Sequence, residues 1–200
     1  MKALAKLQRS KLVADTVQCF GNVSVGAQTR IHEWSILGFP NRDPNLFSNE
    51  NDRIVRIGRQ CVIYPWCLIY EGASISPKVE IHERCMVGSL TAIGTKSLIL
   101  YGAQLHDRVK IGRECIIAGF VADNCTVGDG STVFGALVHR YGQPGRKRWD
   151  STDEQGPVLG KNVVVGWGAV VIGPVKIGDG ARIAPNAVVR ADIAAGERYA

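Results

Sequence analysis

The sequence lacks any apolar run that approaches the roughly 18 residues of a membrane-spanning helix. Residues 1–15, MKALAKLQRSKLVAD, are basic but do not contain the apolar stretch of about 7–15 residues that marks a secretory signal peptide. The two absences argue against a membrane protein and against a secreted one. They favour a cytoplasmic location.

Clusters of like charge are also scarce. The formal net charge is +6, yet the basic residues are scattered, and residues 146–148 form the only tight basic run. A positive balance is compatible with a nucleotide-bearing cofactor, a phosphorylated substrate or nucleic acid. Because the charge is not clustered, nucleic acid is the weakest of these three partners, and we expect a small molecule instead.

What the chain does contain is a six-residue period. From Val13 onward an aliphatic residue recurs every six positions, with a small or apolar residue four positions after it. The hexad that begins at Ile117 is cut short, and the phase resets at Val121. A single domain is expected, with a lead-in over 1–12, coils over 13–38, 57–138 and 158–194, and polar excursion loops near 39–56 and 140–157.

The composition of each hexad predicts two or three residues of strand followed by a corner rich in Gly, Asp and Asn. Three hexads close a triangular coil, and parallel pairing stacks successive coils about 4.8 Å apart. About eight coils are expected. The pattern resembles the hexapeptide-repeat family of left-handed parallel β-helices, an all-β fold. The left hand is implied by that resemblance, since the general rule for crossovers favours the right hand.

The register argues that the six cysteines are structural. Cys61, Cys67, Cys85, Cys115 and Cys125 fall in the inward slot for small residues, and Cys19 falls in the aliphatic slot. A buried free cysteine behaves as a small hydrophobic residue. We therefore expect neither a disulfide nor redox chemistry from these thiols.

Three of the four histidines, His32, His82 and His106, occupy the second position of a hexad, which should face outward. His106 stands in LHDRVKIG. This resembles the His-Asp of sialic-acid and bacillosamine-type sugar N-acetyltransferases of the same fold, although the usual preceding glycine is absent. In those enzymes the histidine is the base, which makes His106 the second choice for that role here.

Histidine spacing also bears on metal binding. The γ-class carbonic anhydrases share this fold and use three histidines, two of them five residues apart. Here 24 and 33 residues separate His82, His106 and His139 in turn. No close pair exists, so no metal site is expected.

His139 stands where the repeat stops and the second excursion loop begins. Extrapolation of the register places it in an inward aliphatic slot, which is unfavourable for imidazole. The chain is therefore expected to leave the coil there and turn His139 toward a cleft. The alternative is a histidine that anchors the loop through a backbone carbonyl.

From about residue 121 to its end, the chain resembles the maltose, galactoside and related O-acetyltransferases. They have a catalytic histidine, a polar loop, a Pro-Val/Ile-x-Ile-Gly restart and further hexads. His139, the loop 140–156 and Pro157–Gly160 follow that order. The resemblance implies an acyl-CoA-dependent acyltransferase with His139 as general base. It would move an acetyl group from acetyl-CoA to a hydroxyl or amine of a sugar, a nucleotide sugar or a similar molecule.

The same resemblance implies a homotrimer, with the site between neighbouring subunits. Ala191 stands where a lysine that contacts the phosphate end of coenzyme A is usual, so the cofactor side departs from the family.

A γ-carbonic-anhydrase-like metalloprotein and a non-catalytic β-helix used in assembly are the alternative functions. The candidates for the cofactor are Gly166, Trp167, Gly168, Pro185 and Arg190, and those for substrate or phosphate are Arg140, Arg146, Lys147 and Arg148.

Overall fold

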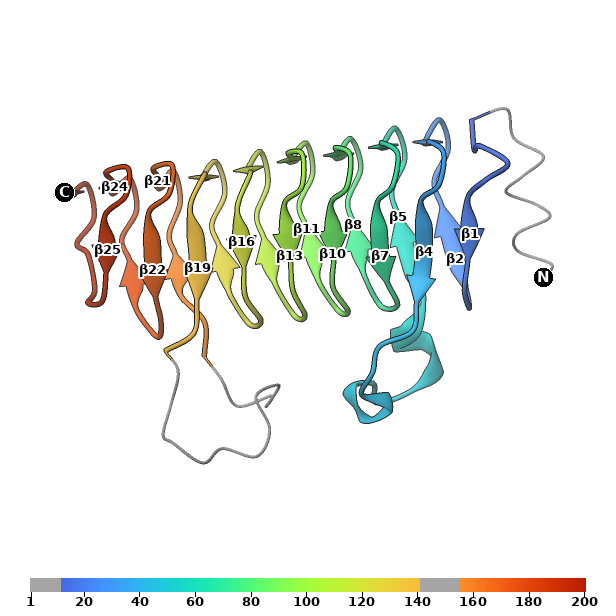
Figure 1. Ribbon diagram of the computed structural model, residues 1–200, viewed down its shortest axis with the longest axis horizontal. Helices are drawn as coiled ribbons and strands as arrows, with labels where there is room; N and C mark the ends of the chain where they lie inside the picture. Colours follow the sequence, from blue (N-terminus) through green and yellow to red (C-terminus); the bar gives the residue numbers. More distant parts are fainter. Residues whose placement is uncertain (1–11, 141–154) are drawn as a thin grey trace.

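A computed structural model of the chain describes residues 12–140 and 155–200 (Figure 1). The strands stack into a prism of three parallel sheets, which we number I to III in the order in which the chain first enters them. The chain passes from sheet I to II to III and back to I, forming a left-handed β-helix. The eight strands of sheet II match the predicted number of coils, and the all-β fold class is confirmed.

The strands are short, as the hexads predict. Sheet I contains β1 (Gln18–Cys19), β4 (Ile36–Phe39), β7 (Leu68–Tyr70), β10 (Met86–Val87), β13 (Gln104–Leu105), β16 (Phe120–Val121), β19 (Ala136–Val138), β22 (Val170–Ile172) and β25 (Val188–Val189). Sheet II contains β2 (Val23–Val25), β5 (Val55–Ile57), β8 (Ser74–Ile75), β11 (Ala92–Ile93), β14 (Lys110–Ile111), β17 (Thr126–Val127), β20 (Val158–Leu159) and β23 (Lys176–Ile177). Sheet III contains β3 (Arg30–Ile31), β6 (Val62–Ile63), β9 (Glu80–Ile81), β12 (Leu98–Ile99), β15 (Ile116–Ile117), β18 (Thr132–Val133), β21 (Val164–Val165), β24 (Arg182–Ile183) and β26 (Arg198–Tyr199).

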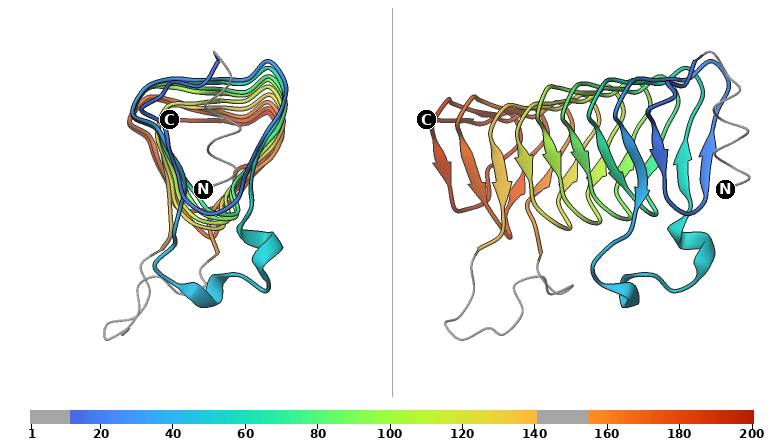
Figure 2. Two further views of the ribbon diagram at one scale, coloured as in Figure 1. Left: turned by 90° about the vertical axis from the view of Figure 1, so that its right-hand side faces the viewer. Right: turned by 45° about the vertical axis from the view of Figure 1, so that its right-hand side comes forward.

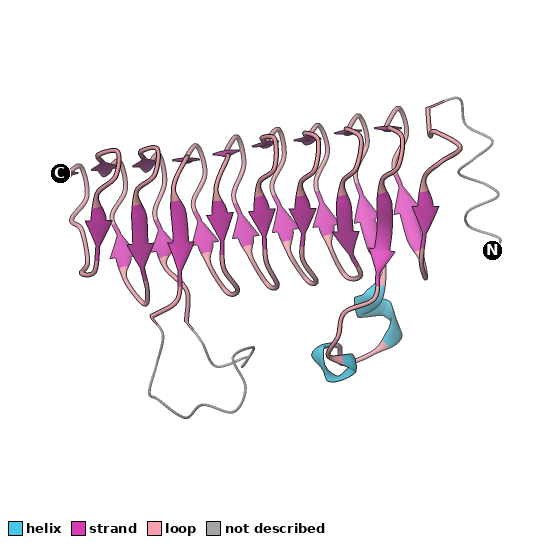
Figure 3. Cartoon of the chain, in the orientation of Figure 1, coloured by secondary structure: helices cyan, strands magenta, loops and turns pink. Residues whose placement is uncertain are grey.

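Both excursion loops leave from the edge between sheets I and II (Figure 2). The first connects β4 to β5 and contains two 3-10 helices, η1 (Pro44–Leu46) and η2 (Glu50–Arg53). The second connects β19 to β20. In the cartoon coloured by secondary structure, the first loop carries the helical turns of η1 and η2 (Figure 3). The two insertions thus flank one stretch of the I–II edge.

Most complete corners contain one residue in the left-handed backbone region, at the fourth position of the hexad. Glycine adopts this conformation without strain, and asparagine does so more readily than other residues. The chain places Asn124 and Gly130 there, but also larger residues such as Trp34 and Trp66, with φ near 60°. The corner positions therefore accept residues with a low intrinsic preference for the left-handed backbone conformation.

The prediction for His139 requires a correction, because the register contains a second shortened hexad. Val133 and Leu137 both point into the core, although four rather than six residues separate them. The predicted shortening after Ile117 is present in the coil below, at the same III–I corner. His139 therefore follows Leu137 by two positions and lies in the third position of its hexad, half-buried at the corner. It does not occupy an inward slot.

Five of the six cysteines are buried in the predicted inward slot, whereas Cys19 is half-buried. Serine and threonine use the same slot: the Ser97 hydroxyl donates to the carbonyl of Gly112 in the next coil, at 2.8 Å. Cys115 repeats this contact with the carbonyl of Gly128, at 3.2 Å. Cysteine thus fills the slot as a small residue with a weak donor, which confirms the structural interpretation.

Burial predicts low thiol reactivity. It raises the pKa of Cys67 to about 12, of Cys85 to about 11 and of Cys125 to about 12, and the thiolate is the reactive form. With excess thiol reagent at pH 8, we expect Cys19 to react in the native protein and the other five only after unfolding. Rapid reaction of several thiols in the native protein would contradict the buried register.

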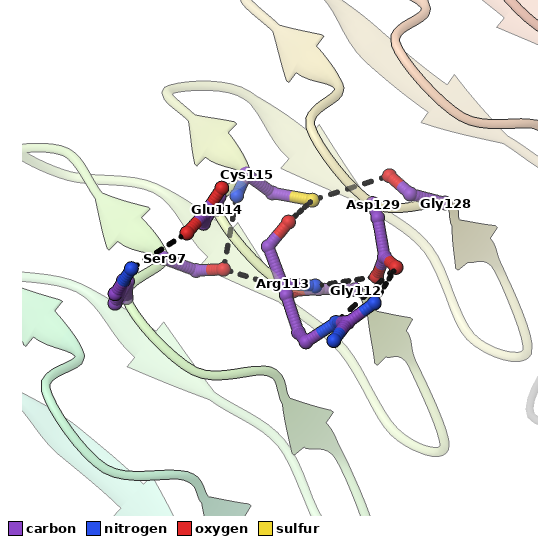
Figure 4. A network of polar contacts seen from close by, with 8 residues as sticks. Ser97, Gly112, Arg113, Glu114, Cys115, Gly128 and Asp129 are labelled. Atoms are coloured by element: carbon purple, nitrogen blue, oxygen red, sulfur yellow. Dashed lines mark hydrogen bonds and ion pairs between the residues drawn. The ribbon is translucent and has the colours of Figure 1, made fainter.

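The edge between sheets II and III shows how neighbouring coils are joined by polar groups (Figure 4). The Asp129 carboxylate accepts the backbone N–H of Arg113 at 2.8 Å and pairs with the Arg113 guanidinium at 2.9 Å. Lys96 donates to Glu114 at 2.9 Å across the next coil boundary. Aspartate in the third position of a hexad thus holds the backbone of the coil before it.

Candidate active site on the edge between the two loops

A ladder of polar side chains follows the I–II edge between the excursion loops. On five successive coils, the third hexad position is occupied by Glu71, Ser89, Asp107, Asp123 and His139. Asp107 Oδ1 accepts the backbone N–H of Ser89 at 2.7 Å, and Asp123 Oδ1 accepts the backbone N–H of Asp107 at 2.8 Å. The aspartates are therefore fixed by the same contact as Asp129 on the II–III edge.

The first excursion loop is attached to this ladder through Asn41. The Asn41 side-chain amide donates to Ser89 Oγ and to Asp107 Oδ2, both at 2.9 Å, and its backbone N–H donates to Glu71 Oε1 at 3.0 Å. Glu71 is only 8% exposed and also accepts from Arg53, at 2.9 Å. Because a buried carboxylate needs such partners, the loop is held firmly against the coils.

His139 closes the ladder at the start of the second loop. Its Nε2 lies 2.7 Å from the backbone carbonyl oxygen of Asp123. A carbonyl only accepts hydrogen bonds, so Nε2 carries a proton in this contact. This is the carbonyl contact of the alternative interpretation, yet it also fixes the tautomer and orientation that a base needs.

His106 lies on the same edge two coils before His139, and its surroundings differ from those of His139. It is half-buried rather than fully outward, its ring packs 4.6 Å from that of Phe120, and its buried Nε2 has no hydrogen-bond partner. Burial lowers the pKa of His106, the carboxylates of Asp123 and Asp107 oppose that shift, and His139 adds to it. The nitrogen without a partner, Nε2, is buried and cannot be reached by an acceptor molecule. His106 is therefore the poorer base of the two histidines.

The lowered pKa of His106 gives a pH dependence of stability. Between the ordinary histidine pKa, about 6.5, and the lower pKa in the folded state, the unfolded chain binds the additional proton. The contribution of His106 to stability is therefore complete above the ordinary histidine pKa. It decreases as the pH falls from there toward the lower pKa of the folded state. We expect His106→Asn to reduce the loss of unfolding free energy between pH 7.5 and 5.5, measured by denaturant titration. An unchanged pH profile in this variant would contradict the assignment to His106.

The structure divides the predicted site residues between two edges. Arg140 and Arg190 lie on the I–II edge with the two histidines, and Arg140 Nη2 donates to the Arg190 carbonyl at 3.5 Å. The candidates Gly166, Trp167, Gly168 and Pro185 lie on the III–I edge instead, between β21 and β22 and between β24 and β25. One chain does not bring these two groups together. Arg146, Lys147 and Arg148 lie outside the described residues.

Sequence reasoning missed the ladder itself. Asn41, Glu71, Asp107 and Asp123 were not among the candidates, although all but Asn41 share one hexad position. Listing the third position at every third hexad would have revealed Glu71, Ser89, Asp107 and Asp123 as a polar column. It would not have added His139, because the second shortened hexad is visible only in the structure. The contact of Asn41 has no such signal, because the conformation of the first loop does not follow from the repeat.

Two further findings concern metals and membranes. Within residues 12–140 and 155–200, no group of three or more His, Cys, Asp or Glu side chains is arranged to hold a metal ion. Over the same residues there is no helix of the length and apolarity needed to cross a membrane.

Comparison with known proteins places the repeat in a family. Residues 156–191 match the model of the bacterial transferase hexapeptide family (six repeats). The chain is 32% identical to the serine acetyltransferase of Helicobacter pylori (strain J99) over 120 residues, covering 58% of this chain and 67% of that protein. It is 35% identical to the serine acetyltransferase of Mycobacterium tuberculosis over 96 residues, 46% of this chain and 39% of that protein.

Solved structures with weaker similarity include two transferases. The UDP-N-acetylglucosamine acyltransferase from Campylobacter jejuni is 16% identical, with a TM-score of 0.39 over 90% of this chain and 68% of that one. A GDP-perosamine N-acetyl transferase variant from Caulobacter crescentus, in complex with CoA and GDP-perosamine, is 20% identical, with a TM-score of 0.30 over 69% and 49%.

The repeat, the fold and the sequence relatives lead to one conclusion. The chain belongs to the hexapeptide-repeat, left-handed β-helix acyltransferase family. Its relatives named above are acetyltransferases, which supports a transferase. The more specific likeness to maltose and galactoside O-acetyltransferases stays a prediction.

Proposed function

We propose that the protein transfers an acyl group, most simply acetyl, from acyl-coenzyme A to a hydroxyl or amine of a small acceptor such as a sugar or nucleotide sugar. The observation that carries this proposal is the position of His139. It stands at the start of one insertion, on the edge that the other insertion also borders, and a backbone carbonyl sets its tautomer. A β-helix used only for assembly has no need for such a histidine.

In the proposed reaction, Nδ1 of His139 takes the proton of the acceptor hydroxyl or amine as the acceptor oxygen or nitrogen attacks the thioester carbonyl. The new bond forms to the acyl carbon, and the carbon–sulfur bond then breaks. The proton held by His139 can pass to the departing thiolate, so that charge and atoms balance. No covalent acyl-enzyme is needed, and the cysteines, being buried, take no part.

We propose further that the site is completed by a neighbouring copy in a homotrimer. Of the residues assigned to the cofactor, all but Arg190 lie on the III–I edge, away from His139, so only a second chain can bring such an edge to the I–II edge. The outward face of sheet I supports a covered surface, because it is apolar at Ile36, Leu68, Met86, Phe120, Ala136, Val170 and Val188. Light scattering should give three times the 21.6 kDa of one chain.

The function is tested by incubating the protein with acetyl-CoA and a panel of acceptors: L-serine, amino sugars, and nucleotide sugars with free hydroxyls or amines. Acetylated product should appear in the mass spectrum with an equal loss of thioester absorbance. Absence of transfer combined with no binding of acyl-CoA at millimolar concentration would favour the assembly protein. Bound metal with bicarbonate dehydration activity would favour the carbonic-anhydrase alternative.

A further inference from the structure

Arg108 has an uncompensated charge in the centre of the candidate site. It occupies the corner of the hexad that begins at Leu105, on the I–II edge between the two excursion loops. Its Nε donates to the side-chain oxygen of Asn124 at 2.8 Å. Across residues 12–140 and 155–200, no carboxylate forms an ion pair with its guanidinium.

Arg53 in the first loop and Arg113 in the coils are held differently. Arg53 pairs with Glu71 and Arg113 pairs with Asp129, each at 2.9 Å. Each of these ion pairs both orients the arginine side chain and neutralises its charge. The neutral amide of Asn124 orients Arg108 through Nε alone and leaves the charge and both terminal amino groups for another partner.

The carboxylates beside Arg108 are engaged elsewhere. Asp107 Oδ1 and Oδ2 accept from the Ser89 backbone N–H and the Asn41 side chain, respectively. Asp123 Oδ1 accepts the backbone N–H of Asp107. The attachment of the first loop through Asn41 therefore fixes the residue that precedes Arg108. It also keeps that carboxylate turned toward the ladder.

We propose that Arg108 binds an anionic group of the acceptor, a phosphate or a carboxylate. This rests on the proposed function and adds the acceptor's chemical class to it. Arg108 lies two coils from His139, about 10 Å along the axis at the spacing of parallel strands. That separation leaves room for a sugar ring between a phosphate on Arg108 and a hydroxyl at His139. Arg190 lies two coils beyond His139 on the other side, where the donor's phosphates would bind.

The proposal is tested by equilibrium binding, which requires no turnover. The probes are UDP for a phosphate-bearing acceptor, L-serine for a carboxylate-bearing acceptor, and coenzyme A for the donor. The variants are Arg108→Gln and, as the matched control, Arg84→Gln, which changes an arginine at the same corner position of the III–I edge. Circular dichroism and thermal unfolding establish that both variants are folded.

Wild-type protein should bind UDP or L-serine, and whichever binds should identify the source of the anion. Arg108→Gln should weaken that binding about tenfold or more, as expected for loss of charge-assisted hydrogen bonds, and leave coenzyme A binding unchanged. Arg84→Gln should bind all probes like wild type. Equal affinity of Arg108→Gln for the bound probe, binding of neither probe to wild type, or loss of coenzyme A binding in Arg108→Gln would each overturn the proposal. His139→Gln should retain probe binding, so an inactive enzyme would not by itself count against Arg108.

Discussion

His139→Gln should lower kcat/KM for acyl transfer by about 10²- to 10⁴-fold, the usual contribution of a positioned general base. Glutamine retains a side-chain N–H that can donate to the Asp123 carbonyl, so the loop anchor is preserved while the base is removed. The affinity for coenzyme A should change little, because proton transfer to His139 stabilises the transition state and does not contribute to ground-state binding. The rate with a fixed acceptor is followed by loss of thioester absorbance.

The matched control is His82→Gln. His82 also follows an inward residue of a strand, but it lies on the III–I side, where its ring packs 4.9 Å from Tyr64. This variant should keep wild-type activity. If His139→Gln kept full activity and His106→Gln lost it, the base would be the other histidine of the edge, and the assignment of His139 would be wrong.

Gly119→Ala should destabilise the fold by about 3 kcal/mol, at the upper end of the range for overpacked sites. Gly119 lies in the first shortened corner, where the next coil approaches so closely that an added Cβ would overlap the carbonyl oxygen of Gly135. The obstacle is backbone rather than a flexible side chain, so the strands on either side must move apart. The midpoint of denaturant unfolding measures the change.

Gly102→Asn provides the comparison for that result. Gly102 occupies the complete corner of the coil below, with φ of 70° and no atom within 4 Å of an added Cβ. Asparagine tolerates this backbone conformation and the position is exposed, so the variant should remain within about 0.5 kcal/mol of wild type. Equal stability of the Gly119→Ala and Gly102→Asn proteins would mean that the shortened corners are less tightly packed than the structure shows.

The sequence predicted the fold well because a six-residue period leaves little freedom. Once Val13 and Ile57 are placed inward, the register fixes every coil until a hexad changes length, and the cysteines could be assigned to the core in the same way. The first shortened hexad was visible as a change of phase after Ile117. The second was hidden, because Leu137 stands four positions after Val133 and so satisfied the rule that a small or apolar residue follows there.

The site was predicted less completely, for a different physical reason. A period assigns residues to faces and corners but does not show which corners carry the same loops. It therefore located His139 without its ladder, and it grouped Trp167 and Pro185 with His139 although sheet I separates the two edges. Only the stacking of coils shows that Asp107, Asp123 and His139 share one edge.

The central claim is that acyl transfer takes place beside His139 on the I–II edge, and a structure with bound coenzyme A tests it most directly. We predict the thiol sulfur within about 4 Å of the His139 imidazole, the reach needed for proton transfer to a group on the reacting carbon. The III–I edge of a neighbouring copy should lie along the rest of the cofactor. A thiol bound on another edge, remote from His139 of every copy, would contradict the claim.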